Sequence, residues 1–406
     1  MTKNAKTTRS IRAHNLVLLQ NTLLHHGPVS RAQLSRLSGL SRPSVSSLIE
    51  ILIAKNLVNE LGLVSDGSGR PGQALDLNRA GLRLIGVEVG ATFIDIVITD
   101  IDGKLIDRSL HDCPVRTDPE GSLTLLKSSL GQIIDQHQEA GLHTLGVGIG
   151  LSSPLTPEHQ DTFSPLLYPA WQNYNLGATI KAHLAIPVVL ENDANLGAVG
   201  EYIWHSKRVQ NLSFIKLDSG IGSGHIVNGT LMTGAQGLAG EIGHIFVDPA
   251  AGDCYCGRHG CLVQVLGLEA IKRTAENLSE SYRHDHNPYE LLRTLSTHSD
   301  HSEDYKEAVN RMAASLAIAL RGIISVLNPE AVILGGQGAY LPELSSRTES
   351  ILKQESPALF NSLISVSCTD ESSPTVALGA CAIVRQQLGE KPCFGVDERH
   401  PQAEAS

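Results

Sequence analysis

The hydrophobic positions of the first 40 residues recur at helical spacing and predict two helices. The first is expected over residues 10–26, where a Gly-Pro pair ends it, with an apolar side formed by Leu16, Leu19, Leu23 and Leu24. A short second helix follows, because Ser30 and Gln33 have the spacing of a capping box. The stretch SGL at 38–40 ends this second helix.

A third helix and a hairpin complete this N-terminal pattern. Ser41 is placed to cap a helix with Pro43 in its first turn, and residues 57–78 then alternate around a Gly-rich tip as two strands of a wing would. This order predicts a winged helix-turn-helix domain over residues 1–80. The expected DNA contacts come from the outer face of the third helix and from the wing: Arg42, Ser44, Ser46, Ser47 and Arg70. A helical bundle used for oligomerisation is the alternative.

Beyond residue 80 the pattern changes to strands, and two segments repeat it. Residues 84–106 and 212–232 each predict a strand, an acidic residue beside a Gly-rich turn, and two further strands joined by an Asp-Gly or Asn-Gly hairpin. We therefore expect two related lobes around a nucleotide cleft, with ordinary hairpins as the alternative. Glycines admit backbone N–H groups to phosphate oxygens, so the candidate nucleotide-binding residues are Glu88, Gly90, Thr92, Gly220, Gly222, Gly224, Gly335 and Gly336.

A metal site is predicted between residues 239 and 262. His244 is followed by Cys254, Cys256 and Cys261, which together supply the three thiolates and one imidazole of a structural zinc site. His259 lies inside the same loop and is an alternative nitrogen ligand. Three buried cysteines without a metal are the other reading.

Composition and charge indicate what kind of partner the protein binds and in which cellular compartment it is expected. The chain has 41% hydrophobic and 18% charged residues, as a globular protein does. Its net charge of -10 conceals a basic head: residues 1–80 hold ten Lys or Arg against four Asp or Glu. A basic head on an acidic body favours a polyanion at the head only, although a solvated basic face has the same charge. We find neither a signal peptide nor a membrane-length apolar run and expect a cytoplasmic protein.

Taken together, these motifs resemble those of the ROK family, which unites repressors, open reading frames and sugar kinases, and the winged head resembles its regulator branch. The resemblance implies an α/β fold with a two-lobed, actin-like, sugar-kinase-like body. We place the lobes at 81–195 and 196–390, with the zinc loop in the second and a flexible tail over 391–406. The resemblance further implies that Asn192, Asp193, Glu241 and His244 lie at a bound sugar, His244 also binding zinc. In the kinases, the aspartate matching Asp193 is the general base.

Three departures from the family pattern weaken the kinase reading. Glu88 replaces an aspartate in the phosphate motif, and its extra methylene brings the carboxylate into the space of Mg-bound phosphate. Leu155 is bulky where many relatives have glycine. Val263 replaces a glutamate that contacts sugar, which suggests a less polar group on the ligand at that point.

These features lead to one main hypothesis and two alternatives. We expect a sugar-responsive transcriptional regulator, a repressor of carbohydrate genes, that binds operator DNA as a homodimer or homotetramer and contains structural zinc. A sugar or sugar phosphate is the expected inducer. The first alternative is an ATP- and Mg-dependent sugar kinase with a DNA-binding head, in which Asp193 is catalytic. The second is a body that docks a protein partner.

Overall fold

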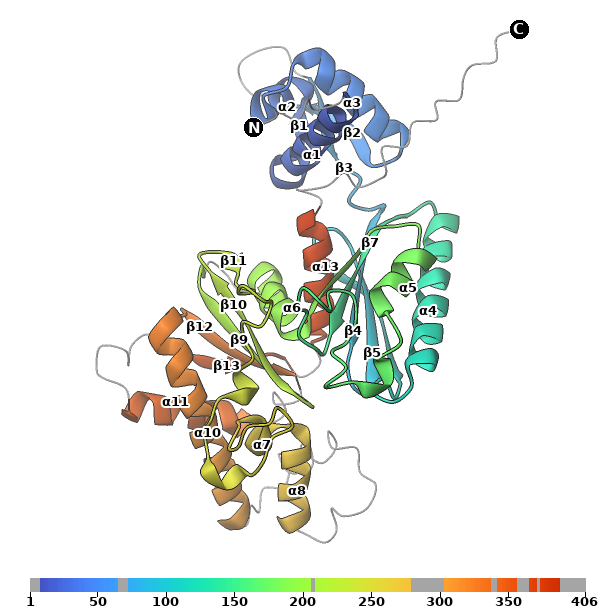
Figure 1. Cartoon of the computed structure of the whole chain (residues 1–406). Helices are drawn as coiled ribbons and strands as arrows, with labels where there is room; N and C mark the ends of the chain where they lie inside the picture. Colours follow the sequence, from blue (N-terminus) through green and yellow to red (C-terminus); the bar gives the residue numbers. More distant parts are fainter. Residues whose placement is uncertain are drawn as a thin grey trace, which may run out of the picture.

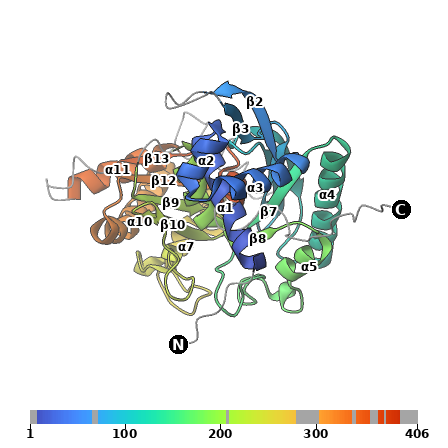
Figure 2. The ribbon, with the colours of Figure 1, turned by 90° about the horizontal axis from the view of Figure 1, so that it is seen from above.

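The computed structural model describes residues 8–64, 72–205, 209–278, 303–336, 342–355, 365–370 and 373–387. A small N-terminal head lies above two larger lobes, each built on its own sheet (Figure 1). Seen from above, the head overlies the region where the two lobes meet (Figure 2). Arg70 and the predicted tail over 391–406 lie outside the described residues.

The head contains the helices and strands that the hydrophobic pattern predicts. Its helices are α1 (Thr8–His26), α2 (Arg31–Ser38) and α3 (Arg42–Ala54), and its sheet has the order β1 (Val29–Ser30), β3 (Gly72–Leu77), β2 (Val58–Val64). The capping box at the start of α2 is confirmed, since Ser30 and Gln33 each bond the other's backbone N–H. Ser41 caps α3 as expected.

The first lobe is a five-stranded mixed sheet covered on both faces. Its strand order is β6 (Leu105–Asp112), β5 (Phe93–Thr99), β4 (Leu82–Val89), β7 (His143–Leu151), β8 (Val188–Asn192). Helices α4 (Pro119–Glu139) and α5 (Leu176–His183) pack on one side (Figure 1). The C-terminal helix α13 (Thr375–Gln387) packs against β4 and β7 on the other side.

The second lobe repeats this topology, which confirms the internal repeat. Its strand order is β11 (Thr230–Leu231), β10 (Ile221–Val227), β9 (Leu212–Leu217), β12 (Ala331–Gly336), β13 (Val366–Cys368). In both sheets three antiparallel strands adjoin two parallel ones. The α-helices in the described part of this lobe include α7 (Val263–Leu266), α8 (Leu268–Leu278), α10 (Glu303–Leu327) and α11 (Pro342–Glu355).

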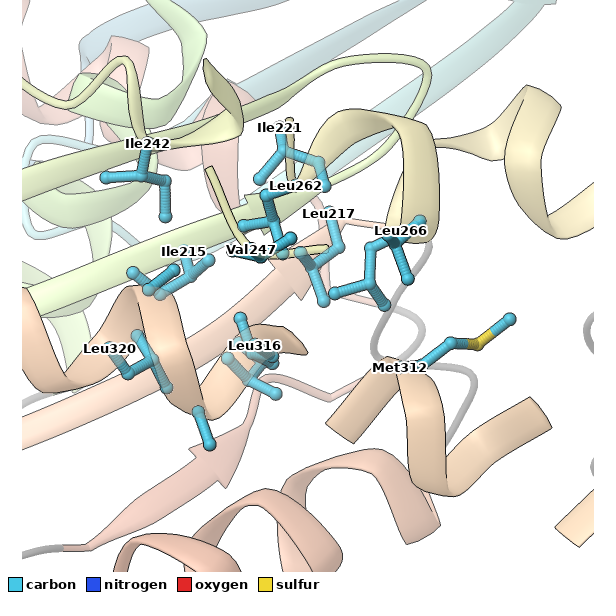
Figure 3. Packing of buried hydrophobic residues seen from close by; sticks show 14 of the residues in the cluster. Ile215, Leu217, Ile221, Ile242, Val247, Leu262, Leu266, Met312, Leu316 and Leu320 are labelled. Atoms are coloured by element: carbon cyan, nitrogen blue, oxygen red, sulfur yellow. The ribbon is translucent and has the colours of Figure 1, made fainter. Parts of the chain in front are cut away.

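Helix α10 supplies much of the second lobe's core. Over Lys306–Leu327 it is long and apolar enough to cross a membrane by length and composition alone, and 56% of that stretch is buried. Its residues Met312, Leu316 and Leu320 pack in one cluster with Ile215 and Leu217 of β9 and with Leu262 of the predicted metal-binding loop (Figure 3). The helix therefore has the environment of a core helix.

Helix α6 (Asp193–Gly200) lies between the two sheets and packs against α13. Glycines allow this close approach: a Cβ on Gly379 would lie 1.8 Å from the Leu196 carbonyl oxygen, and one on Gly224 would lie 2.4 Å from that of Ala194.

The predicted boundary between the two lobes needs correction. The range 196–390 was assigned to the second lobe, but α13 packs on the first.

The head is joined to the body by one continuous apolar cluster. Leu19 and Leu23 of α1 belong to the same buried cluster as Leu84 of β4 and Leu378 and Val384 of α13. The C-terminal helix of the body thus lies at the junction with the head.

Candidate functional site: a ligand cleft and a metal centre

Asp193 lies at the first position of α6, directly after strand β8. Asn192 is the N-cap, and its Oδ1 accepts a bond of 3.1 Å from the Asn195 backbone N–H. The Asn192 amide donates to the Ser153 carbonyl and to Asp193 Oδ1, both at 3.2 Å. Asp193 Oδ1 also accepts the Ala194 N–H at 2.8 Å. The asparagine thus orients the aspartate and begins the helix.

Lys216 is the partner that the sequence analysis did not foresee. Its Nζ lies 2.6 Å from Asp193 Oδ2, 2.8 Å from Glu88 Oε1 and 3.4 Å from Asp218 Oδ2. Lys216 is on β9, whose six residues are all buried. A lysine inside the apolar stretch LSFIKL was the available signal, because a buried lysine requires charged partners.

Burial and charge act in opposite directions on this cluster. Burial raises the pKa of Glu88 to about 7, although the adjacent Lys216 ammonium lowers it. The pKa of Lys216 lies well above its usual value because Asp193, Glu88 and Asp218 together outweigh the effect of its burial. The ammonium therefore stays charged at neutral pH, while Glu88 takes up a proton near pH 7.

The raised pKa of Glu88 predicts a pH-dependent stability. Between pH 4.5 and 7 the folded protein retains a proton that the unfolded chain has lost, so this stabilisation is present at low pH and disappears as pH rises through about 7. We expect Glu88→Gln to remove about 2 kcal/mol of the decrease in unfolding free energy between pH 5 and 8. Urea denaturation of both proteins across this range measures the difference. Parallel pH profiles would contradict the assignment.

A cavity of about 260 Å³ opens beside Lys216 between the two lobes. Of the predicted nucleotide residues, Glu88, Thr92 and Gly336 line it. Packing accounts for three of the others, since a Cβ would lie 2.5 Å from the Phe93 ring at Gly90, 2.3 Å from the Phe214 ring at Gly335, and against α6 at Gly224. Gly222 lies near α6 as well, and Gly220 faces open space. The glycine pattern thus serves packing more than phosphate binding.

Glu241 lies near Asp193, as expected for a shared ligand site. Burial and, to a smaller extent, the charge of Asp193 together raise the pKa of Glu241 to about 7. Glu241 precedes the short helix η3 (Ile242–His244), which brings it close to the predicted metal ligand His244. Gly240 before it has φ +97°, and a Cβ there would lie 1.8 Å from the Ser223 carbonyl oxygen. The segment is thereby held tightly against β10.

The structure brings the four predicted metal ligands together. One ligand atom from each of His244, Cys254, Cys256 and Cys261 lies within 4.8 Å of the others. Cys254 Sγ is 3.6 Å from His244 Nδ1, and Cys256 Sγ is 3.7 Å from Cys261 Sγ. A tetrahedron with metal–sulfur bonds of about 2.3 Å places neighbouring sulfurs about 3.8 Å apart, so this donor set fits a zinc ion.

The alternative ligand His259 is occupied elsewhere. Its Nδ1 lies 3.0 Å from Asp253 Oδ1, and its Nε2 lies 2.7 Å from the Pro249 carbonyl oxygen. Both ring nitrogens therefore point to partners outside the sulfur cluster. The geometry favours His244 as the nitrogen ligand.

Val263 is a buried residue of the second lobe. It begins α7, is 6% exposed, and belongs to the core cluster of the second lobe. The burial of Val263 is thus accounted for by packing in the core of the second lobe, and its expected effect on the choice of ligand stays a prediction.

The predicted DNA contacts lie along one side of α3. Arg42 and Ser47 are exposed, and Ser44 and Ser46 are half-buried, while Val45, Leu48, Ile49 and Leu52 face the core of the head. The Ser44 hydroxyl lies 2.8 Å from that of Ser41, so it takes part in capping the helix. Arg42, Ser46 and Ser47 are left as the outward-facing set.

Two sheets of equal topology enclosing a polar cleft, with a helix between them, define the two-lobed class of sugar-kinase-like α/β proteins. The chain belongs to the ROK family, whose model matches residues 84–387. It is 28% identical over 384 residues to a xylose repressor of Caldicellulosiruptor bescii, covering 91% of this chain and 95% of the repressor. A glucokinase of Thermotoga maritima is 28% identical over 327 residues, 76% of this chain and 99% of the kinase.

The fold has a solved counterpart over almost its whole length. A ROK family transcriptional regulator, described as a homologue of the E. coli Mlc protein, superposes with a TM-score of 0.74 at 22% identity. The superposition covers 94% of this chain and 97% of that one. The arrangement of head and lobes is therefore one that the family uses.

Proposed function

We propose that this protein is a sugar-responsive transcriptional repressor that binds operator DNA with its head. The observation that carries the proposal is the extent of similarity. The family model spans 84–387, whereas the alignment with a xylose repressor covers 91% of the chain and so extends into the head. The glucokinase aligns over 99% of its own length with only 76% of this chain. The kinase thus matches the body and leaves the head unaccounted for.

We infer that the head is a winged helix-turn-helix domain. Helices α2 and α3 are joined by a tight turn with Gly39 at φ +72°, and strands β2 and β3 form an antiparallel hairpin after them. Such a unit places its second helix in the major groove. Paired heads of a homodimer or homotetramer would then bind paired half-sites.

Arg42→Ala is expected to weaken operator binding without changing ligand binding. Arg42 is exposed at the start of α3, where a guanidinium reaches base edges or a phosphate, and such a contact is worth about 1 to 3 kcal/mol. Fluorescence anisotropy with labelled operator DNA should show a loss of roughly 5- to 100-fold. Arg347→Ala on α11 is the matched control, because Arg347 already bonds Glu343 and Asn310. An equal loss in both variants would contradict the assignment.

We further propose that the cleft beside α6 binds the inducing sugar. Asn192 donates to Asp193, and Glu241 lies close enough to Asp193 for their charges to interact. A zinc ion on His244 and the three cysteines would stiffen the segment that carries Glu241. Ligand binding would favour one arrangement of the lobes and thereby move α13, which contacts the head. As expected for a regulator of genes, we place the protein in the cytoplasm.

The proposal is tested on the full-length protein with genomic fragments selected by binding. Bound fragments are titrated with xylose, glucose and amino sugars, with and without Mg-ATP. We expect at least one sugar to change operator affinity in the absence of ATP. If ADP release accompanied sugar addition and disappeared in Asp193→Asn, the kinase reading would replace this one. If no sugar acted while a protein partner did, the docking reading would be favoured.

A further inference from the structure

Lys216 connects the two lobes through buried ion pairs. It lies near the end of β9 in the second sheet, and Asp218 directly follows this strand. Glu88 is on β4 of the first sheet, and Asp193 directly follows the first-lobe strand β8. The Lys216 side chain is 3% exposed, and its partners Glu88, Asp193 and Asp218 are 10%, 8% and 6% exposed. The contacts at 2.6 and 2.8 Å therefore cross from one lobe to the other, away from water.

The ammonium has a carboxylate for each of its donors. A lysine side chain carries three N–H donors and no acceptor. Asp193, Glu88 and Asp218 take these positions at 2.6, 2.8 and 3.4 Å. Three acidic side chains therefore surround the ammonium, so Lys216 does not have the free ammonium of a phosphate-binding lysine.

The same atoms that would hold magnesium surround Lys216. Mg²⁺ lies about 2.0 to 2.1 Å from its oxygen ligands. An ion bound jointly by Glu88 Oε1 and Asp193 Oδ2 would have to share the space of Nζ, which lies 2.8 and 2.6 Å from these atoms. The fold family includes kinases, but these residues do not fit a metal-bound nucleotide.

The rest of the cavity is also unsuited to a triphosphate. Its walls include Asp95, Asp112 and Asp370 in addition to Glu88 and Asp218. Arg108, the other cation in the wall, bonds Asp95 with its Nε and Nη2 at 2.9 to 3.2 Å. Both cations among the described residues of the wall are thus already paired with carboxylates, so a ligand with several negative charges would have to compete with these carboxylates for them, whereas an uncharged ligand would not.

We propose that the Lys216 ammonium permanently supplies the positive charge in the cleft between the lobes. It takes the place of a metal ion as the positive charge that joins the two lobes, so the cavity beside it excludes a metal-bound nucleotide and an uncharged polyhydroxy ligand acts on the protein without ATP. The choice of ligand rests on the proposed function, but the exclusion of metal and nucleotide does not.

The direct test measures divalent cations on the full-length, zinc-loaded protein. Free Mn²⁺ is followed by electron paramagnetic resonance in the wild type, in Lys216→Ser and in Lys181→Ser, a control whose lysine pairs with Asp161 at the surface. Removing the ammonium leaves three carboxylates around an open space. Lys216→Ser should therefore bind Mn²⁺ roughly tenfold or more tightly than the wild type. The control should match the wild type. Equal Mn²⁺ affinity in all three would overturn the proposal.

If Lys216→Ser fails to fold, the proposal is tested on the wild type alone. Its thermal midpoint should not change in Mg-ATP, and a rise that depends on ATP concentration would overturn the proposal. Operator binding is measured on the same preparation with sugar. If the wild type binds Mg-ATP and its operator affinity still responds to sugar, the proposal about Lys216 is wrong but the proposed function stands. If the wild type does not bind Mg-ATP and no sugar changes its operator affinity, the proposed function is wrong but the proposal about Lys216 stands.

Discussion

Cys261→Ser is expected to abolish metal binding and to destabilise the second lobe by at least about 4 kcal/mol, a loss typical of a structural metal site. Cys261 is fully buried within the core cluster that also contains Leu262 and Leu266, so the site and the core are one unit. Its Sγ lies 3.7 Å from that of Cys256. Serine would remove one of the four ligands and leave a buried hydroxyl in its place.

Metal analysis and thermal denaturation, each with and without a chelator, measure this effect. The wild type should contain one zinc per chain and lose stability with the chelator, whereas Cys261→Ser should contain none and be insensitive to it. Cys368→Ser is the control, since Cys368 lies on β13 and outside the predicted ligand set. If the wild type holds no metal and the chelator changes nothing, the cysteines are packing residues only.

Asp193→Asn should lower sugar affinity by roughly 10- to 100-fold, the effect of losing a hydrogen bond to a charged group. A carboxylate has about four acceptor positions. The Ala194 N–H, the Asn192 amide and Lys216 Nζ occupy three of them, which leaves one for a ligand hydroxyl. An asparagine would also turn an N–H group either toward the Ala194 N–H or toward the Lys216 ammonium.

Calorimetric titration of the inducing sugar measures this loss, and the affinity for operator without sugar should be unchanged. Asp161→Asn is the matched control, because Asp161 pairs with Lys181 at the surface. An unchanged sugar affinity in Asp193→Asn would exclude Asp193 from the ligand site. A loss of both sugar and operator binding would instead indicate that the residue mainly supports the fold.

Local patterns in the sequence predicted much of this architecture. Ser30 and Gln33 predicted the start of α2 because capping involves residues three positions apart, and the cysteine spacing predicted the metal cluster for a similar reason. The repeated strand pattern predicted two lobes of equal topology. The choice between His244 and His259 required the structure, since both lie within reach along the chain.

The features that sequence did not reveal depend on contacts between distant segments. Lys216 meets Glu88 and Asp193 only because β9 faces the first lobe in three dimensions. Gly224 and Gly335 resemble phosphate-binding glycines in sequence, but a helix and a phenylalanine ring occupy the space beside them. Val263 departs from the family's sugar-contacting glutamate because this chain uses the position for its core.

The contact between α6 and α13 has a mechanical consequence. A Cβ on Gly379 would lie 1.8 Å from the Leu196 carbonyl oxygen, and one on Gly200 would lie 2.7 Å from that of Thr375, so the two backbones touch without intervening side chains. Such a joint cannot absorb a displacement by changing rotamers. We therefore expect α6 and α13 to move as one rigid unit, which extends from Asp193 to the apolar cluster that α13 shares with the head.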